Sequence, residues 1–220
     1  SKLKSRWPKK TIQFIPMMLP RLRSKTLSKV IARKRLGLDQ DKKIVLFVGN
    51  ISSHHYYKGV DTLLNTARLL PNNCQIIVAG RGDKADYYKQ WVTSHHLEDK
   101  IMFPGFVPDQ KLPLYYQSAD VFVLPSTSNS EGFGLVLLEA MSYKVPTITT
   151  TAIASAAWFK ENHVTQLIPP NNSKVLATVI HKTIEKPPEQ MITQAYHFAR
   201  KFTLKNMVNK TIELYETLVN

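Results

Sequence analysis

Short apolar runs alternate with helix-like segments along most of this chain. Such runs, rich in Val, Ile, Leu and Phe and bounded by turn residues, are typical of buried strands. The predicted strands lie at 43–50, 74–82, 100–107, 120–126, 145–150 and 165–170, and the predicted helices at 60–70, 85–97, 109–119, 132–143, 173–185, 189–201 and 204–219. Strands that are apolar on both faces favour a parallel sheet covered by helices. The chain is therefore predicted to be α/β, with a Rossmann-like doubly wound parallel sheet and helices on both faces.

Length and charge distribution indicate how the chain is divided. Its 220 residues, 43% of them hydrophobic, suffice for one substantial domain. Residues 1–38 contain twelve Lys and Arg and no Asp or Glu, whereas residues 39–220 carry 18 basic and 16 acidic residues. We expect a basic arm or interdomain linker at 1–38, with a strand at 11–16. A Rossmann-like domain should follow at 39–200, and a final helix at 201–220.

The charge of the arm favours a polyanionic partner. An anionic membrane surface is the expected partner and nucleic acid the less favoured one. The alternative is a solvated linker, or an arm that packs on a part of the protein outside this chain. Cys74 is the only cysteine, which argues against a disulfide framework or a cysteine-rich metal site. No run approaches the ~18 apolar residues of a membrane span, and the N-terminus lacks a signal-peptide core. These features favour a cytoplasmic protein, with any membrane contact peripheral and at the inner face.

Two acidic residues follow the fourth predicted strand, where ligands of doubly wound sheets bind. Glu131 begins the sequence Glu131-Gly132-Phe133-Gly134, and Glu139 comes eight positions after it. The glycines allow the backbone to approach a ligand closely. The helix that begins near Gly134 offers unpaired N–H groups and a positive dipole end to a phosphate. The site is therefore a candidate for a phosphate-containing ligand.

The spacing of the two acids limits what they can do together. Glu139 lies roughly 8 to 12 Å further along the helix, at ~1.5 Å per residue, so the two carboxylates are too far apart to share a proton or a metal ion. Each can instead accept hydrogen bonds from neighbouring hydroxyls. This arrangement fits a nucleotide sugar, with ribose at one acid, hexose at the other and pyrophosphate between. The alternative is a helix-dipole acid plus an ordinary helix residue, and spacing alone leaves both readings open.

The segment "SEGFGLVLLEAMSYKVPTITT" (130–150) closely resembles the donor-binding signature of the retaining glycosyltransferases of family 4, also called glycosyl transferases group 1. That signature is a Glu, seven residues and a second Glu, with Gly-Phe-Gly between them. Further segments resemble the family in the same order, namely "VLFVGN", "YYKGVDTLLNTARLL", "IIVAGRGD" and "IMFPGFVPDQKLPLYYQSADVFVLPS". The resemblance spans about 44–170 and returns weakly at 196–218.

The resemblance implies one half of a GT-B fold, namely the C-terminal, donor-binding half. The N-terminal, acceptor-binding domain would then be a missing partner, toward which the helix at 201–220 would pack. The implied function is transfer of a hexose from a nucleotide sugar to a glycan, lipid or protein acceptor, with retention of anomeric configuration. A UDP-hexose is the favoured donor and a GDP-hexose the second. The half alone is expected to bind donor and to transfer poorly, in a setting such as polysaccharide biosynthesis.

The resemblance also implies roles for individual residues. Glu131 would hold hydroxyls of the transferred sugar, Glu139 the ribose and Lys58 the pyrophosphate, and Glu131 and Lys58 are the candidate catalytic residues. Backbone N–H groups at 133–135 would bind sugar and phosphate oxygens, and the backbone at 103–105 would face the base. No metal and no other cofactor is expected. The predicted donor-binding residues are Gly49, Asn50, Lys58, Arg81, Phe103, Gly105, Glu131, Gly132, Phe133, Gly134, Leu135 and Glu139.

Two positions depart from the family pattern. Asn50 stands where the family usually has an arginine after the first strand, so one phosphate partner is lost, and His54, His55 or Arg81 could compensate. Lys144 stands where a glycine usually ends the helix, which predicts local backbone strain. Aromatic residues at helical spacings, Tyr116 among them, are interpreted as core. Because of Asn50, a second function stays open: a non-catalytic anion- or nucleotide-binding module that uses the basic arm on a membrane or nucleic acid.

Overall fold

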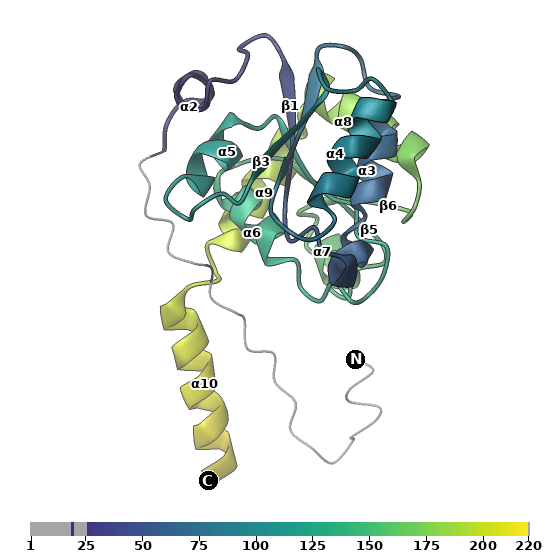
Figure 1. Ribbon diagram of the computed structural model, residues 1–220. Helices are drawn as coiled ribbons and strands as arrows, with labels where there is room; N and C mark the ends of the chain where they lie inside the picture. The colour runs from purple at the N-terminus through teal and green to yellow at the C-terminus, as the bar shows by residue number, and fades with distance from the viewer. Residues whose placement is uncertain (1–18, 20–25, 220) are drawn as a thin grey trace. The chain divides into compact units, whose positions relative to one another are not determined.

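The computed structural model describes residue 19 and residues 26–219 (Figure 1). The chain divides into two compact units, one of Arg23–Ala199 and one of Ser1–Leu22 with Arg200–Asn220. In the smaller unit, the backbone N–H of Leu19 donates to the carbonyl of Phe202, and α10 spans Leu204–Val219. The predicted strand at 11–16 lies outside the described residues.

Six strands of the described residues form one sheet in the larger unit. The sheet order is β3-β2-β1-β4-β5-β6, and every neighbouring pair is parallel. The strands are β1 (Lys43–Val48), β2 (Cys74–Ala79), β3 (Ile101–Gly105), β4 (Val121–Leu124), β5 (Thr147–Thr150) and β6 (Gln166–Ile168). The predicted Rossmann-like doubly wound sheet is confirmed. The direction of winding reverses between β1 and β4, and ligands of such sheets bind beyond the strand ends at this position.

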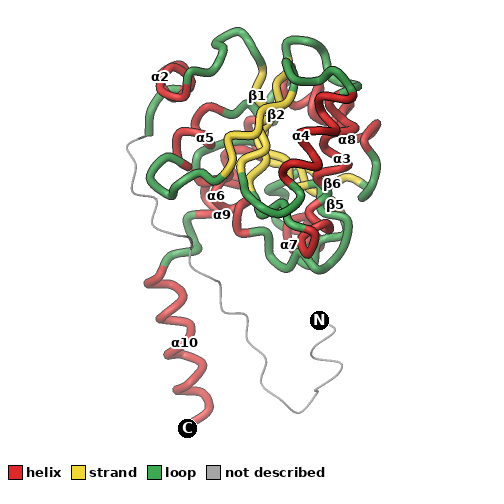
Figure 2. The backbone as a smooth tube through the Cα atoms, in the orientation of Figure 1, coloured by secondary structure: helices red, strands yellow, loops and turns green. Residues whose placement is uncertain are grey.

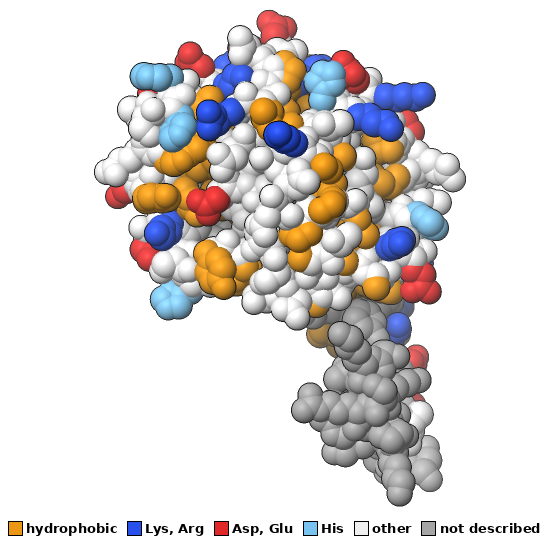
Figure 3. All heavy atoms as spheres, turned by 90° about the vertical axis from the view of Figure 1, so that its right-hand side faces the viewer, with side chains coloured by type: hydrophobic (Ala, Val, Ile, Leu, Met, Phe, Trp, Pro, Cys, Tyr) orange, Lys and Arg blue, Asp and Glu red, His pale blue; other side chains and the backbone are white. Residues whose placement is uncertain are grey.

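Helices cover both faces of this sheet, as Figures 1 and 2 show. One face carries α3 (Val60–Ala67), α4 (Ala85–Ser94) and α8 (Ser173–Glu185), and the other carries α5 (Leu112–Ser118), α6 (Leu135–Ser142) and α9 (Glu189–Ala199). The helices bury apolar stripes at helical spacing, as predicted; α3 buries Val60, Leu63, Leu64 and Ala67. In Figure 3, which faces α3, α4 and α8, basic, acidic and histidine side chains are interspersed. This mixture agrees with the nearly balanced charge of residues 39–220.

The helix α2 (Lys29–Leu36) lies within the stretch predicted as a basic arm, yet it belongs to the larger unit and contacts α5. Its Arg33 is buried, and the guanidinium donates to Oδ2 of Asp120 at 2.6 Å. The same carboxylate oxygen accepts a hydrogen bond from the backbone N–H of Ile44. A buried arginine needs such a partner, so Asp120 ties α2 to the first strand of the sheet.

Two short helices and one strained residue complete the description of the larger unit. The 3-10 helix η1 (Ser53–Lys58) and the helix α7 (Ala156–Glu161) were not predicted. Lys144 has a φ of 59°, so the predicted strain at this position is confirmed. Among the described residues, no helix combines the length and the apolar character that crossing a membrane would require.

Candidate functional site

Loops that follow different strands meet at the carboxyl edge of the sheet. The backbone N–H of Thr127, after β4, donates to the carbonyl of Tyr57 in η1 at 2.7 Å. The backbone N–H of Ala154, after β5, donates to the carbonyl of Glu131 at 3.0 Å. These bonds fix the loops after β1, β4 and β5 against one another, with Glu131 among them.

Two glycines allow these loops to approach backbone to backbone. Gly59 has a φ of 75°, and a Cβ at this position would lie 2.0 Å from the carbonyl oxygen of Pro125. A Cβ at Gly80 would lie 1.8 Å from the carbonyl oxygen of Gly49. No side chain fits at such separations, so the geometry of this edge depends on glycine at both positions.

Lys58 and Glu131 form an ion pair across the switch point. The Nζ of Lys58 donates to Oε2 of Glu131 at 2.6 Å, and the two side chains are 14% and 10% exposed. Lys58 ends η1, and its stem lies beside Gly49, where a Cβ would come within 3.2 Å of the lysine Cδ. Oε1 of Glu131 accepts no hydrogen bond from the described residues. The two predicted catalytic residues are therefore brought together, with Lys58 bound to the acid.

Glu139 is held in a similar way by a residue that the sequence had placed in the core. Tyr116 of α5 donates its hydroxyl to Oε2 of Glu139 at 2.6 Å, while Oε1 has no hydrogen-bond donor within the described part of the chain. Burial raises the pKa of Glu139, the bond from Tyr116 lowers it, and the charge of Asp109 raises it. Each glutamate thus has one oxygen engaged by a partner on another element and one oxygen available to a ligand.

The N-terminus of α6 lies between the two glutamates in the sequence. Gly134 is its N-cap, with a φ of 73°, and it has no side chain that could bind the N–H groups of the first turn. The preceding residue, Phe133, accepts a hydrogen bond on its carbonyl from the hydroxyl of Ser155. Gly132 is exposed and Leu135 half-buried. This helix end can offer backbone N–H groups to phosphate oxygens.

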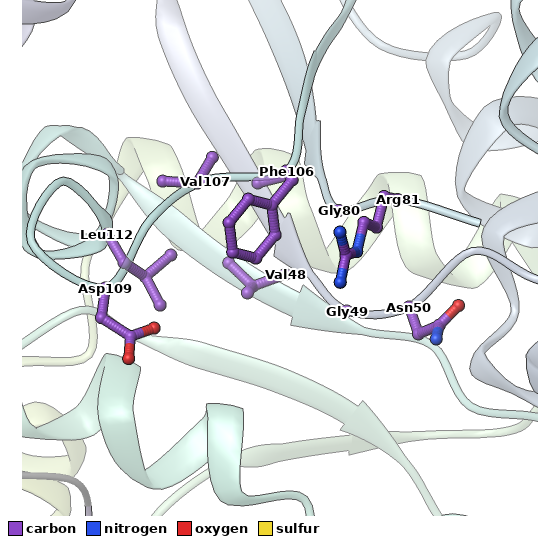
Figure 4. A pocket seen from close by; sticks show the side chains of 10 residues that line it. Val48, Gly49, Asn50, Gly80, Arg81, Phe106, Val107, Asp109 and Leu112 are labelled. Atoms are coloured by element: carbon purple, nitrogen blue, oxygen red, sulfur yellow. The ribbon is translucent and has the colours of Figure 1, made fainter.

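A hollow of about 280 Å³ opens beside the ends of β1 and β2 (Figure 4). The Arg81 guanidinium lies between the Phe106 ring and Asn50, and it is 4.8 Å from the centroid of that ring. Phe106 is 59% exposed, so its ring is accessible to a ligand in the hollow. The lining residues are Val48, Gly49, Asn50, Ala79, Gly80, Arg81, Phe106, Val107, Asp109 and Leu112.

The hollow refines the predicted set of binding residues. Gly49, Asn50 and Arg81 line it, whereas Phe103 and Gly105 do not. Of the three side chains that could compensate for Asn50, only Arg81 lines the hollow. Asn50 itself accepts a hydrogen bond from the backbone N–H of Ser52.

Two contributors were missed from the sequence, namely Asp109 and Tyr116. Phe106 lies in the stretch 104–106 directly after a strand end, where the sequence predicts ligand contact, although no individual role is predicted for it. Among the described residues, no three His, Cys, Asp or Glu side chains are grouped so that they could hold a metal ion.

Comparison with solved structures shows that this chain shares its fold with GT-B glycosyltransferases. The sucrose-phosphate synthase of Thermosynechococcus elongatus is similar with a TM-score of 0.79 and 23% identity, over 99% of this chain and 56% of that one. HepE of Anabaena, in complex with UDP-glucose, is similar with a TM-score of 0.75 and 23% identity, over 86% of this chain and 52% of that one. At these identities the likeness concerns the fold.

The family is shown by the sequence itself. The model of the family described as "Glycosyl transferases group 1" matches residues 28–198, and the chain belongs to that family. An uncharacterized glycosyltransferase of Methanocaldococcus jannaschii is 35% identical over 128 residues, which is 56% of this chain and 31% of that protein. The chain thus spans about half of the two structures and a third of this relative.

Proposed function

We propose that this chain is the C-terminal, donor-binding part of a retaining glycosyltransferase of family 4 that transfers a hexose from a nucleotide sugar. The observation that carries the proposal is that Glu131 and Glu139 are held in the same way. Lys58 binds one carboxylate oxygen of Glu131, and Tyr116 binds one carboxylate oxygen of Glu139. The other oxygen of each acid is available to a hydroxyl of the ligand. A UDP-hexose is the favoured donor, which the UDP and UDP-glucose complexes of HepE support, and a GDP-hexose is the second candidate.

The proposed mechanism assigns one task to each part of the site. Ribose hydroxyls donate to Glu139 and hexose hydroxyls to Glu131, while the hollow beside Arg81 and Phe106 takes the base. The diphosphate lies at the α6 N-terminus, where Lys58 can turn its remaining N–H donors toward it. Charge that develops on the leaving diphosphate is then stabilised by Lys58 and the helix end. No general base is assigned, since retention is explained by attack on the face from which the diphosphate departs.

The acceptor side of the reaction is proposed to lie outside this chain. The chain spans about half of the structures that it resembles, so an acceptor-binding domain, N-terminal to it, completes the proposed enzyme. The acceptor would be a glycan, a lipid or a protein, as in polysaccharide biosynthesis. Contact of the basic residues of 1–38, other than the buried Arg33, with an anionic membrane at the inner face is part of the same proposal.

Calorimetric titration of the 220-residue chain with UDP-, GDP- and ADP-glucose tests the proposal. We expect binding of one of these donors, and a loss of about 10- to 100-fold in affinity for Glu139→Ala, the range for a hydrogen bond to a charged group. Glu185→Ala is the control, because Glu185 is exposed on α8. If no donor binds at millimolar concentration while anionic vesicles or DNA do, the chain is an anion-binding module instead.

The raised pKa of Glu139 predicts a pH dependence of donor binding. Only the ionised carboxylate offers all its lone pairs to the ribose hydroxyls, so affinity should fall as pH decreases through this pKa. Because burial holds the pKa above its ordinary value, the fall should begin at a higher pH than an exposed glutamate would give. Dissociation constants measured between pH 8 and 5 give this fall in affinity, and Glu139→Gln should abolish it. If the fall persists in Glu139→Gln, another titrating group causes it.

A further inference from the structure

We propose that Tyr116 is a positioning residue for nucleotide recognition. Its hydroxyl holds one oxygen of Glu139 and thereby presents the other oxygen to the ribose hydroxyls. The proposal rests on the function proposed above for Glu139, and it adds a residue that contacts no part of the donor. A nucleotide would sense Tyr116 only through the carboxylate.

The surroundings of Tyr116 leave its side chain little freedom. Tyr116 is 1% exposed, and its ring stacks on Tyr143 with centroids 5.6 Å apart and planes at 9°. The centroid of the Phe122 ring of β4 lies 5.8 Å from that of Tyr116, with the planes at 44°. The Tyr116 ring thus contacts a strand and the end of α6, the helix that carries Glu139. A donor placed so rigidly can define where the carboxylate lies.

The carboxylate needs such a constraint because its own torsion does not supply one. The terminal torsion of a glutamate is broad, so an unrestrained carboxylate samples many orientations. A hydrogen bond of 2.6 Å from a buried hydroxyl selects one of them before the nucleotide arrives. Binding then loses less side-chain freedom, which is how preorganisation raises affinity.

The surroundings of Tyr116 favour the protonated hydroxyl, which can act as a donor. Burial, followed by the charge and the hydrogen bond of Glu139 and the neighbouring Tyr143, raises the pKa of Tyr116 well above its usual value. The titratable groups that act on Glu139 are Tyr116 from α5 and Asp109 from the loop before α5. Of these two, only Tyr116 lowers the pKa of Glu139, so its hydrogen bond favours the ionised acid.

The test measures recognition of the ribose hydroxyls in the full chain. UDP and 2′,3′-dideoxy-UDP are titrated against wild type, Tyr116→Phe and the control Tyr115→Phe, which removes a hydroxyl from the neighbouring position of α5. We expect wild type and Tyr115→Phe to prefer UDP by about 10-fold or more, and Tyr116→Phe to lose most of this preference through weaker UDP binding. In Tyr116→Phe, the fall of UDP-glucose affinity with decreasing pH should also begin at a higher pH, because the hydrogen bond that lowers the Glu139 pKa is gone.

The outcomes separate this proposal from the one on which it rests. If wild type shows no preference for the ribose hydroxyls, the proposed role of Glu139 fails, and this proposal with it. If wild type shows the preference and Tyr116→Phe retains it, or weakens both ligands equally, Tyr116 only supports the fold. Glu139→Gln should lose no further preference when combined with Tyr116→Phe. Tyr116→Met, which fills the space without a donor, carries the same prediction if Tyr116→Phe does not fold.

Discussion

Replacing Gly59 by alanine is expected to lower the free energy of unfolding by more than ~4 kcal/mol. The added Cβ would lie 2.0 Å from the carbonyl oxygen of Pro125, so two backbone segments would have to separate. The left-handed φ of 75° adds about 1–2 kcal/mol of strain for any L side chain. The segments involved carry Lys58 and the loop before Glu131, so the donor site should be distorted with the fold. Urea unfolding followed by circular dichroism measures the loss.

Gly105→Ala separates the two causes. Gly105 has almost the same φ, 74°, but nothing lies within 4 Å of the added Cβ. It should therefore lose only the strain, about 1–2 kcal/mol. Equal losses in the two variants would mean that the contact with Pro125 relaxes freely, and that the loops after β1 and β4 are not held by this approach.

The sheet could be predicted because its strands are apolar on both faces. Ile44 and Phe47 of β1 and Val121 and Leu124 of β4 are all 0% exposed, and such strands leave an unbroken apolar run in the sequence. The unpredicted elements, η1 and α7, have six residues each, too few for a helical period to show. The basic residues of α2 are typical of a solvated arm. The sequence does not show that Arg33 is buried, because its partner Asp120 lies 87 positions further along the chain.

The candidate site was predictable in its members and not in its contacts. The residues after each strand end could be named, since parallel strands end at one edge. That Lys58 pairs with Glu131 could not be foreseen, because it depends on β1 and β4 being neighbours and on side-chain directions. Tyr116 satisfied the pattern of a core aromatic, and it is buried as predicted. Helical spacing carries no information on where its hydroxyl points.

Lys58→Met is the second variant with a large expected effect, and it acts on both stability and binding. Glu131 would lose the partner of its largely buried carboxylate, which should lower the free energy of unfolding by about 3 kcal/mol. Affinity for the nucleotide sugar should fall by about 10- to 100-fold, because a charge-assisted contact to the diphosphate is lost. Chemical unfolding and calorimetric titration of the same preparation measure the two effects.

The double variant Lys58→Met/Glu131→Gln shows whether these effects have one cause or two. It removes both charges and keeps similar volumes, so it leaves no unpaired ion, and its stability should return to within about 1 kcal/mol of wild type. Affinity should stay low, since the contact of Lys58 with the diphosphate is still missing. If the double variant instead recovers affinity together with stability, Lys58 serves only to neutralise Glu131. The diphosphate must then be bound by the α6 N-terminus and Arg81, and the assignment of Lys58 to the leaving group is wrong.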